Sequence, residues 1–166
     1  MTARQPSAST QFSTFMSRFP DEIVALVKRC MPKLRRELPG ANQIVYDYNH
    51  SVVVSFSMSE RGYEAIVAMA VLSGEVKLYF DKSLPDPKGL LMGTGSKVRS
   101  VTVKAASDLD RGDIYELLKA AIKHSGVSFP RTSATRAGRM IIQSQSKKAS
   151  KKKDPKKPRT RKAAKA

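Results

Sequence analysis

The sequence has few of the residues that disulfides, zinc sites and membrane spans require. Its one cysteine, Cys30, rules out a disulfide within the chain, and its place on an apolar helical stripe predicts a buried, unreactive thiol. The two histidines, His50 and His124, have no cysteine or histidine at ligand spacing. The longest apolar run, 65–72, has eight residues, far short of the roughly 20 that cross a membrane. We therefore expect a cytoplasmic protein without a disulfide, a cofactor or membrane insertion.

Large apolar residues are also missing from the end of the chain, where charge of one sign replaces them. Residues 131–166 hold 14 Lys and Arg against one acid, Asp154, whereas residues 1–130 hold 17 against 13 acids. A segment that lacks apolar side chains cannot bury a core, and its like charges repel one another. The sequence therefore predicts a disordered leader at 1–11, a folded domain at 12–128 and a disordered polybasic tail at 129–166.

Hydrophobic periodicity predicts the elements of the domain. Apolar residues at three- and four-residue spacing predict a helix from Asp21 to about residue 38, with a kink or break at Pro32, and a second helix after Asp108. Between the helices, strands are expected at 44–48, 52–56, 65–72, 75–80 and 97–104, with a hairpin turn at Asn49-His50. Consecutive strands joined by short turns indicate an α+β fold with two layers, a mostly antiparallel five-stranded sheet with the N- and C-terminal helices packed on one face.

Four segments of the domain resemble the YdhG-like family, a group of bacterial domains. They are Leu38-Pro39-Gly40-Ala41, Val-Lys-Leu-Tyr-Phe at 76–80, Gly-Thr-Gly-Ser-Lys-Val-Arg at 93–99 and Ala-Ala-Ser-Asp-Leu-Asp at 105–110. The resemblance covers about residues 12–125 and implies a small two-layer α+β domain with no settled enzymatic role. One branch of the family is similar to frataxins in acting as an intracellular iron chaperone. The basic tail is not part of the family pattern.

A glycine-rich segment is the first candidate ligand site. Its members are Gly93, Gly95, Lys97 and Arg99, whose backbone N–H groups and cations suit an anion such as a phosphate. The segment is not a Walker motif, because Ser96 rather than glycine precedes the lysine and a strand rather than a helix follows. A turn into a charged edge strand explains the same residues.

An acidic cluster is the second candidate site. Its members are Asp108, Asp110, Asp113 and Glu116, an open carboxylate patch that suits weak iron binding of the kind that the frataxin-like branch would need. Their spacing does not fit an EF-hand. Capping of the second helix and compensation of its dipole account for the same carboxylates.

Aromatic residues gather on and near the predicted strands. They are Tyr46, Tyr48, Tyr63, Tyr79 and Phe80. Such rings can stack on nucleic-acid bases, although aromatic side chains on strands commonly belong to the core or to the surface of the sheet.

The tail supplies the candidate nucleic-acid contacts. Its eleven cations after Gln143 are Lys147, Lys148, Lys151, Lys152, Lys153, Lys156, Lys157, Arg159, Arg161, Lys162 and Lys165. Their setting among Ala, Ser and Pro resembles the tails of linker histones, and their affinity would come from counterion release without base recognition.

We therefore predict a non-enzymatic domain whose tail binds nucleic acid nonspecifically, with DNA favoured, in the cytoplasm or associated with the nucleoid. Four alternatives stay open. They are an iron chaperone, a phosphate-ligand protein or enzyme with a site near the glycine-rich segment, a tail that binds anionic lipid headgroups, and a solubility tail without a dedicated partner.

Overall fold

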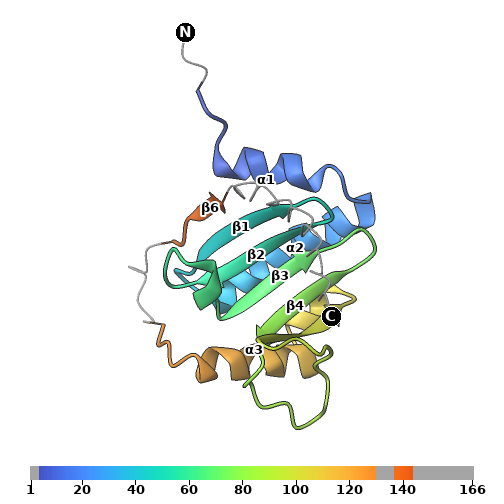
Figure 1. The fold of residues 1–166 in the computed structure, drawn as a ribbon, viewed down its shortest axis with the longest axis vertical. Helices are drawn as coiled ribbons and strands as arrows, with labels where there is room; N and C mark the ends of the chain where they lie inside the picture. Colours follow the sequence, from blue (N-terminus) through green and yellow to red (C-terminus); the bar gives the residue numbers. More distant parts are fainter. Residues whose placement is uncertain (1–3, 130–136, 144–166) are drawn as a thin grey trace, which may run out of the picture.

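The computed structural model describes residues 4–129 and 137–143 (Figure 1). Its helices are α1 (Ala8–Met16), α2 (Asp21–Glu37) and α3 (Asp113–His124), with two 3-10 turns, η1 (Gly62–Glu64) and η2 (Ala106–Leu109). Its strands are β1 (Asn42–Tyr48), β2 (Ser51–Ser57), β3 (Val67–Val71), β4 (Val76–Asp81), β5 (Val98–Val103) and β6 (Met140–Gln143). The predicted α+β class with a mostly antiparallel sheet is confirmed.

The strands form one sheet in the order β5-β4-β3-β2-β1-β6. Each pairing is antiparallel except that of β1 with β6. The predicted turn at Asn49-His50 is present, since β1 ends at Tyr48 and pairs it with Ser51 at the start of β2.

One face of the sheet packs against α2, which lies behind the strands in Figure 1. Side chains alternate across a strand, so register partners share a face. Val54, Met69 and Leu78 are such partners, and all three are completely buried. They join Val27 and Leu34 of α2 in a single apolar cluster, to which α1 and α3 also contribute. This cluster is the core of the domain.

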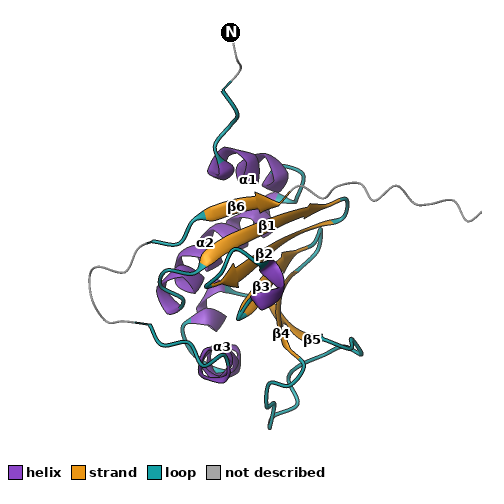
Figure 2. Cartoon of the chain, turned by 60° about the vertical axis from the view of Figure 1, so that its left-hand side comes forward, coloured by secondary structure: helices purple, strands orange, loops and turns teal. Residues whose placement is uncertain are grey.

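The opposite face, which we call the open face, carries smaller and more polar residues. Ser55, Ala68 and Tyr79 are register partners there. Of the described helical segments, only the short η1 lies over this face, on the side away from α2 (Figure 2). Ser55 is buried, whereas Ala68 and Tyr79 are half-buried and line a pocket, so a ligand can approach this face over β3 and β4.

The predicted number of strands, five, is wrong, because residues 140–143 of the predicted tail form a sixth. The backbone N–H of Gln43 donates to the Arg139 carbonyl at 2.8 Å, and β6 then runs parallel to β1. Gly138 makes this approach feasible, since a side chain at that position would overlap the carbonyl of Ala41. Because the segment around it is strongly basic, the short apolar run at 140–143 was assigned to the tail in the prediction from sequence.

Two further expectations about the N-terminal part need correction. Helix α1 begins within the predicted leader, where Ser7 caps it by accepting from the Thr10 N–H at 3.1 Å. Its Phe12 and Phe15 pack against the core, which accounts for the order of this segment. Of the kink or break expected at Pro32, the break is absent, since helix α2 continues through this exposed residue. None of the described helices is long and apolar enough to cross a membrane.

Candidate functional site

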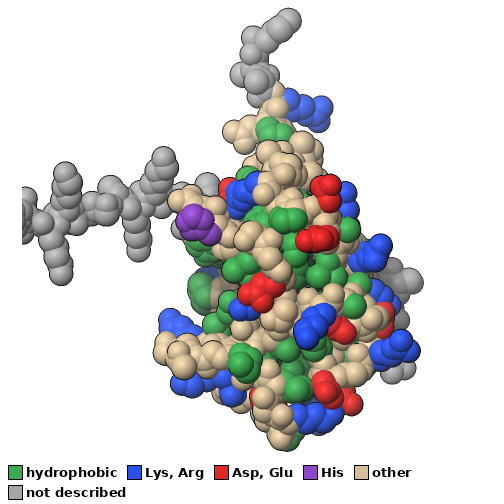
Figure 3. Space-filling view, turned by 90° about the vertical axis from the view of Figure 1, so that its right-hand side faces the viewer, with side chains coloured by type: hydrophobic (Ala, Val, Ile, Leu, Met, Phe, Trp, Pro, Cys, Tyr) green, Lys and Arg blue, Asp and Glu red, His purple; other side chains and the backbone are tan. Residues whose placement is uncertain are grey.

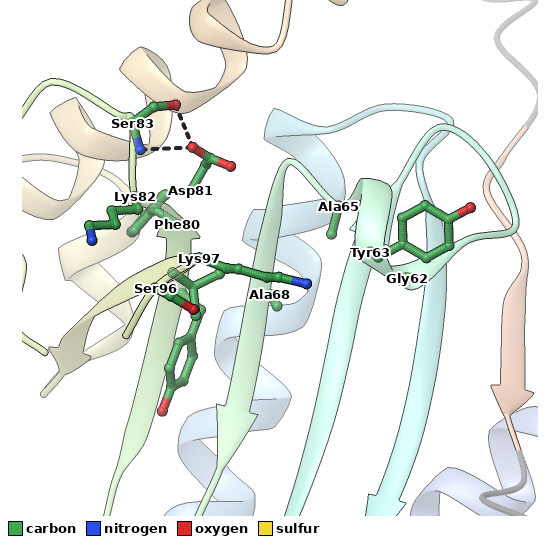
Figure 4. A pocket seen from close by; sticks show the side chains of 12 residues that line it. Gly62, Tyr63, Ala65, Ala68, Phe80, Asp81, Lys82, Ser83, Ser96 and Lys97 are labelled. Atoms are coloured by element: carbon green, nitrogen blue, oxygen red, sulfur yellow. Dashed lines mark hydrogen bonds between the residues drawn. The ribbon is translucent and has the colours of Figure 1, made fainter. Parts of the chain in front are cut away.

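The open face carries a groove of about 780 Å³ (Figure 4). Tyr63 of η1 lies on one side of the groove and Lys97, at the entry to β5, on the other, while Ala68 and Tyr79 come from strands between them. The Lys97 side chain extends across the sheet toward Ala68 (Figure 4). The groove is broad and open, so it suits an extended or planar ligand.

Phenylalanine and tyrosine are sorted between the two faces of the sheet. All six phenylalanines lie in the core or against it: Phe12, Phe15, Phe19, Phe56, Phe80 and Phe129. Four of the five tyrosines lie on the open side, and only Tyr115 is elsewhere, on α3. The aromatic group that the sequence singled out is therefore divided, with Phe80 in the core and its four tyrosines on the open side.

The tyrosines of the open face are positioned by β1 and η1. The rings of Tyr46 and Tyr48 are stacked, with centroids 6.3 Å apart and planes at 22°. A side chain at Gly62 would overlap the Tyr46 hydroxyl, so η1 rests directly against this ring. The side chain of Tyr63, which follows, is 81% exposed. A solvent-exposed ring held on a short turn is available for contact with a ligand.

The four residues of the predicted anion-binding segment do not lie around one site in the structure. Met92 and Ser100 exchange backbone hydrogen bonds of 2.7 and 2.9 Å, which makes the residues between them a hairpin loop. Gly93 has a φ of +115°, a conformation that favours glycine. The guanidinium of Arg99 points away from the groove and donates to the Lys82 carbonyl at 3.0 Å. Of the four predicted residues, only Lys97 lines the groove; Gly93 and Gly95 form the turn.

A second cation of the open face, Lys77, belongs to a small polar network. Its ammonium lies 2.9 Å from the Glu75 carboxylate, and Thr102 donates to the other oxygen of that carboxylate at 3.2 Å. The hydrogen bond between the two charges raises the pKa of Lys77 and lowers the pKa of Glu75. Lys77 therefore keeps its positive charge on the open face.

Asp81, Ser83 and His124 form a linked set beside the groove that the sequence analysis did not identify. The Ser83 hydroxyl and backbone N–H both donate to the Asp81 carboxylate, the latter at 2.8 Å. These bonds hold the pKa of Asp81 below its usual range, which makes the carboxylate a poor base. The Ser83 oxygen lies 2.9 Å from Nε2 of His124, which must then be the donor. The set therefore braces β4 against α3 and does not activate a serine nucleophile.

The predicted iron cluster is divided among separate partners. Asp108 accepts backbone hydrogen bonds of 3.0 Å from Lys104 and Ala105, and so acts as a cap. Asp110 pairs with Lys33 and, at 2.9 Å, with Arg36, and these hydrogen bonds lower its pKa.

The other two carboxylates of the cluster, Asp113 and Glu116, share the Lys88 ammonium at 2.6 and 3.0 Å. Within residues 4–129 and 137–143, no three Asp, Glu, His or Cys side chains are grouped as a metal site needs. The structure does not bring the four predicted residues together around one point.

Cys30 and His50 lie in different surroundings. Cys30 is completely buried in the core, and its burial, followed by the nearby Asp108 carboxylate, raises the pKa of the thiol to about 11. A thiol with so high a pKa is a poor nucleophile at neutral pH. His50 is exposed in the turn between β1 and β2.

The eleven predicted nucleic-acid contacts of the tail lie outside the described residues. The last described residue before them, Gln143, is the register partner of Tyr46. The described part of the chain therefore ends on β6, at the register partner of a tyrosine of the open face. On the side of the molecule that Figure 3 presents, acidic and basic side chains alternate and no charge of one sign gathers.

No family model, curated protein or solved structure matches this chain. The resemblance to the YdhG-like family consequently stays a prediction. The arrangement of the open face, with its tyrosines, two lysines and adjoining basic segment, has to be interpreted from its own chemistry.

Proposed function

We propose that this chain is a non-enzymatic nucleic-acid-binding protein whose basic tail provides most of the affinity, with DNA as the favoured partner. The observation that carries the proposal is the place where the charge begins. The chain leaves the sheet at Gln143, and the 23 residues that follow hold 11 Lys and Arg against a single acid, Asp154.

The physical basis is the release of counterions from DNA. Each lysine or arginine that contacts a phosphate releases a condensed counterion, and the resulting favourable free energy of binding does not depend on the base sequence. Flexible lysines seldom make the fixed bidentate contacts that distinguish bases, so little sequence preference is expected. The similarity of the tail to linker-histone tails supports the choice of DNA.

The folded part contributes little net charge of its own. Its acids are largely paired with neighbouring cations, as in Arg18 with Asp47 at 2.5 Å and Lys77 with Glu75 at 2.9 Å. The part of the tail after Gln143, in contrast, has one acid for its eleven cations. Electrostatic attraction to a polyanion is therefore concentrated in the tail.

Two features support a role without catalysis. The Ser83 hydroxyl donates to a carboxylate of lowered pKa, and the Cys30 thiol is buried, so neither is activated for attack. An iron-chaperone role has no comparable support, because the candidate carboxylates are engaged by lysines, an arginine and backbone N–H groups. We propose that the folded part is a YdhG-like domain to which this tail is attached.

The test compares the full chain with a chain that ends at Gln143, which keeps β6. A matched control keeps the full length and replaces the nine tail lysines with glutamine. In fluorescence anisotropy with a labelled 20-base-pair duplex near 0.1 M salt, both variants should bind at least about a hundredfold more weakly. Undiminished affinity in the chain ending at Gln143 would move the duplex-binding site into the domain and contradict the proposal.

A further inference from the structure

We infer that the open face is a second contact surface, on which bases of a single-stranded nucleic acid stack on tyrosine rings. The inference rests on the proposed function, since the tail would hold the strand near the sheet. It adds a preference that the tail alone cannot provide, namely for strands whose bases are unpaired.

The tyrosines of the open side are spread from β1 to β4. Tyr48 and Tyr46 are stacked on β1, and the η1 residue Gly62 lies against the Tyr46 ring. Tyr63, which follows Gly62, and Tyr79 of β4 both line the groove. Strand β4 is three strand spacings from β1, which corresponds to about 14 Å. A single strand of a few nucleotides is long enough to reach from β1 to β4.

Next to Tyr79 the groove is lined by a small side chain. Ala68 of β3 is the register partner of Tyr79, is half-buried and lines the groove, so its short side chain does not obstruct a planar base. Aromatic side chains beside small ones allow bases to lie against the rings, a contact that every base can make.

Cations accompany the rings. Lys97 is exposed, extends across the groove (Figure 4), and forms no ion pair with the acids of residues 4–129 or 137–143. Lys77 supplies a second ammonium on the same face. Phosphates that run beside stacked bases need such charges, so the chemistry of the face matches both parts of a nucleotide.

The tail favours this occupant over a protein partner. The described chain ends at Gln143, the register partner of Tyr46, and the 11 cations that follow it in the sequence attract a polyanion to the protein. Duplex DNA hides the faces of its bases within the stack, whereas a single strand can present them to the rings. The open face should therefore discriminate between the two, although the tail binds both.

The experiment uses the full chain and two labelled probes, a 12-nucleotide oligothymidine and a 12-base-pair duplex. The test variant is Tyr63→Leu/Tyr79→Leu, which keeps apolar volume but removes two rings. The control is Tyr115→Leu, which removes the one tyrosine outside the open face. We expect the double variant to bind oligothymidine at least about tenfold more weakly, with duplex affinity unchanged within about twofold, and the control to match wild type.

Tyrosine emission provides a second measurement, because the chain has no tryptophan and four of its five tyrosines lie on the open side. Saturation with oligothymidine should quench this emission, and saturation with the duplex should not. Tyr63→Ala guards against misfolding, since that side chain is 81% exposed and its loss leaves the core intact. It should retain the wild-type melting temperature and still weaken oligothymidine binding.

Three results would overturn the inference. The first is equal binding of oligothymidine by wild type, Tyr63→Leu/Tyr79→Leu and Tyr63→Ala. The second is an equal loss of affinity for oligothymidine and duplex in the double variant. The third is no quenching of tyrosine emission by oligothymidine. Failure of the proposed function is a separate outcome, since it would appear as undiminished duplex binding by the chain that ends at Gln143, whatever the tyrosine variants do.

Discussion

At the scale of single residues, the carboxylate of Asp108 has a defined structural task. It accepts the backbone N–H groups of Lys104 and Ala105, both at 3.0 Å, where the chain turns from β5 into η2. Both N–H groups donate to the same Asp108 oxygen, so two backbone hydrogen bonds of the turn depend on this one side chain. Sequence analysis predicted capping for this acid as the alternative to iron binding.

Asp108→Ala should therefore lower the free energy of unfolding by about 1 to 2 kcal/mol, as loss of a capping side chain does elsewhere. The matched control is Asp113→Ala, an acid of the same cluster whose exposed pair with Lys88 should be worth no more than about 0.5 kcal/mol. Urea denaturation of both variants measures the difference. Equal losses would show that the two hydrogen bonds of Asp108 contribute no more than a surface ion pair.

Residues of the open face differ in how well the sequence predicted them. Tyr46 and Tyr48 are two positions apart on a strand, and period-two alternation alone places them on one face. Tyr63 could not be placed in this way, because a 3-10 turn of three residues has no periodic pattern. The separation of Lys97 from Arg99 was also out of reach, since it depends on how a long loop folds back on β5.

At the scale of elements, β6 shows where sequence patterns fail. The strand has four residues, and its partner β1 lies almost a hundred positions earlier in the chain. Periodicity cannot be detected in so short a run, and parallel pairing with a distant strand leaves no local turn signal. The α2 stripe, the β1–β2 hairpin and β4 were predictable because each has a long or turn-bounded pattern.

A chain that ends at Pro130, just beyond the domain expected at 12–128 from the sequence, should be less stable than a chain that ends at Gln143. It would lose the packing of Met140 and Ile142 against the core and the cover that Ile141 gives to the buried Ile44. Burial of half-exposed apolar side chains of this kind contributes about 1 to 3 kcal/mol in total.

Thermal unfolding followed by circular dichroism measures this effect. The chain ending at Gln143 should melt within a few degrees of the full chain, and the chain ending at Pro130 several degrees lower. Identical melting of the two truncated chains would mean that β6 adds nothing to the stability of the sheet.

At the scale of the whole molecule, the chain combines a domain of nearly balanced charge with a terminal segment of eleven cations and one acid. The sequence predicted this division because composition needs no fold to be seen. It could not predict that Gln143, the last residue before the basic segment, would be the register partner of Tyr46, since that depends on the pairing of β6 with β1. This junction is what links the tail to the sheet in the proposed function.

The central claim is that tail cations bind DNA phosphates, and the salt dependence of duplex binding tests it most directly. If five to eight of the eleven cations meet phosphates, log K for the full chain should fall against log salt with a slope of about −4.5 to −7. The chain that ends at Gln143 should give a slope no steeper than about −2, because few phosphate contacts would be left. Equal slopes for the two chains would contradict the account.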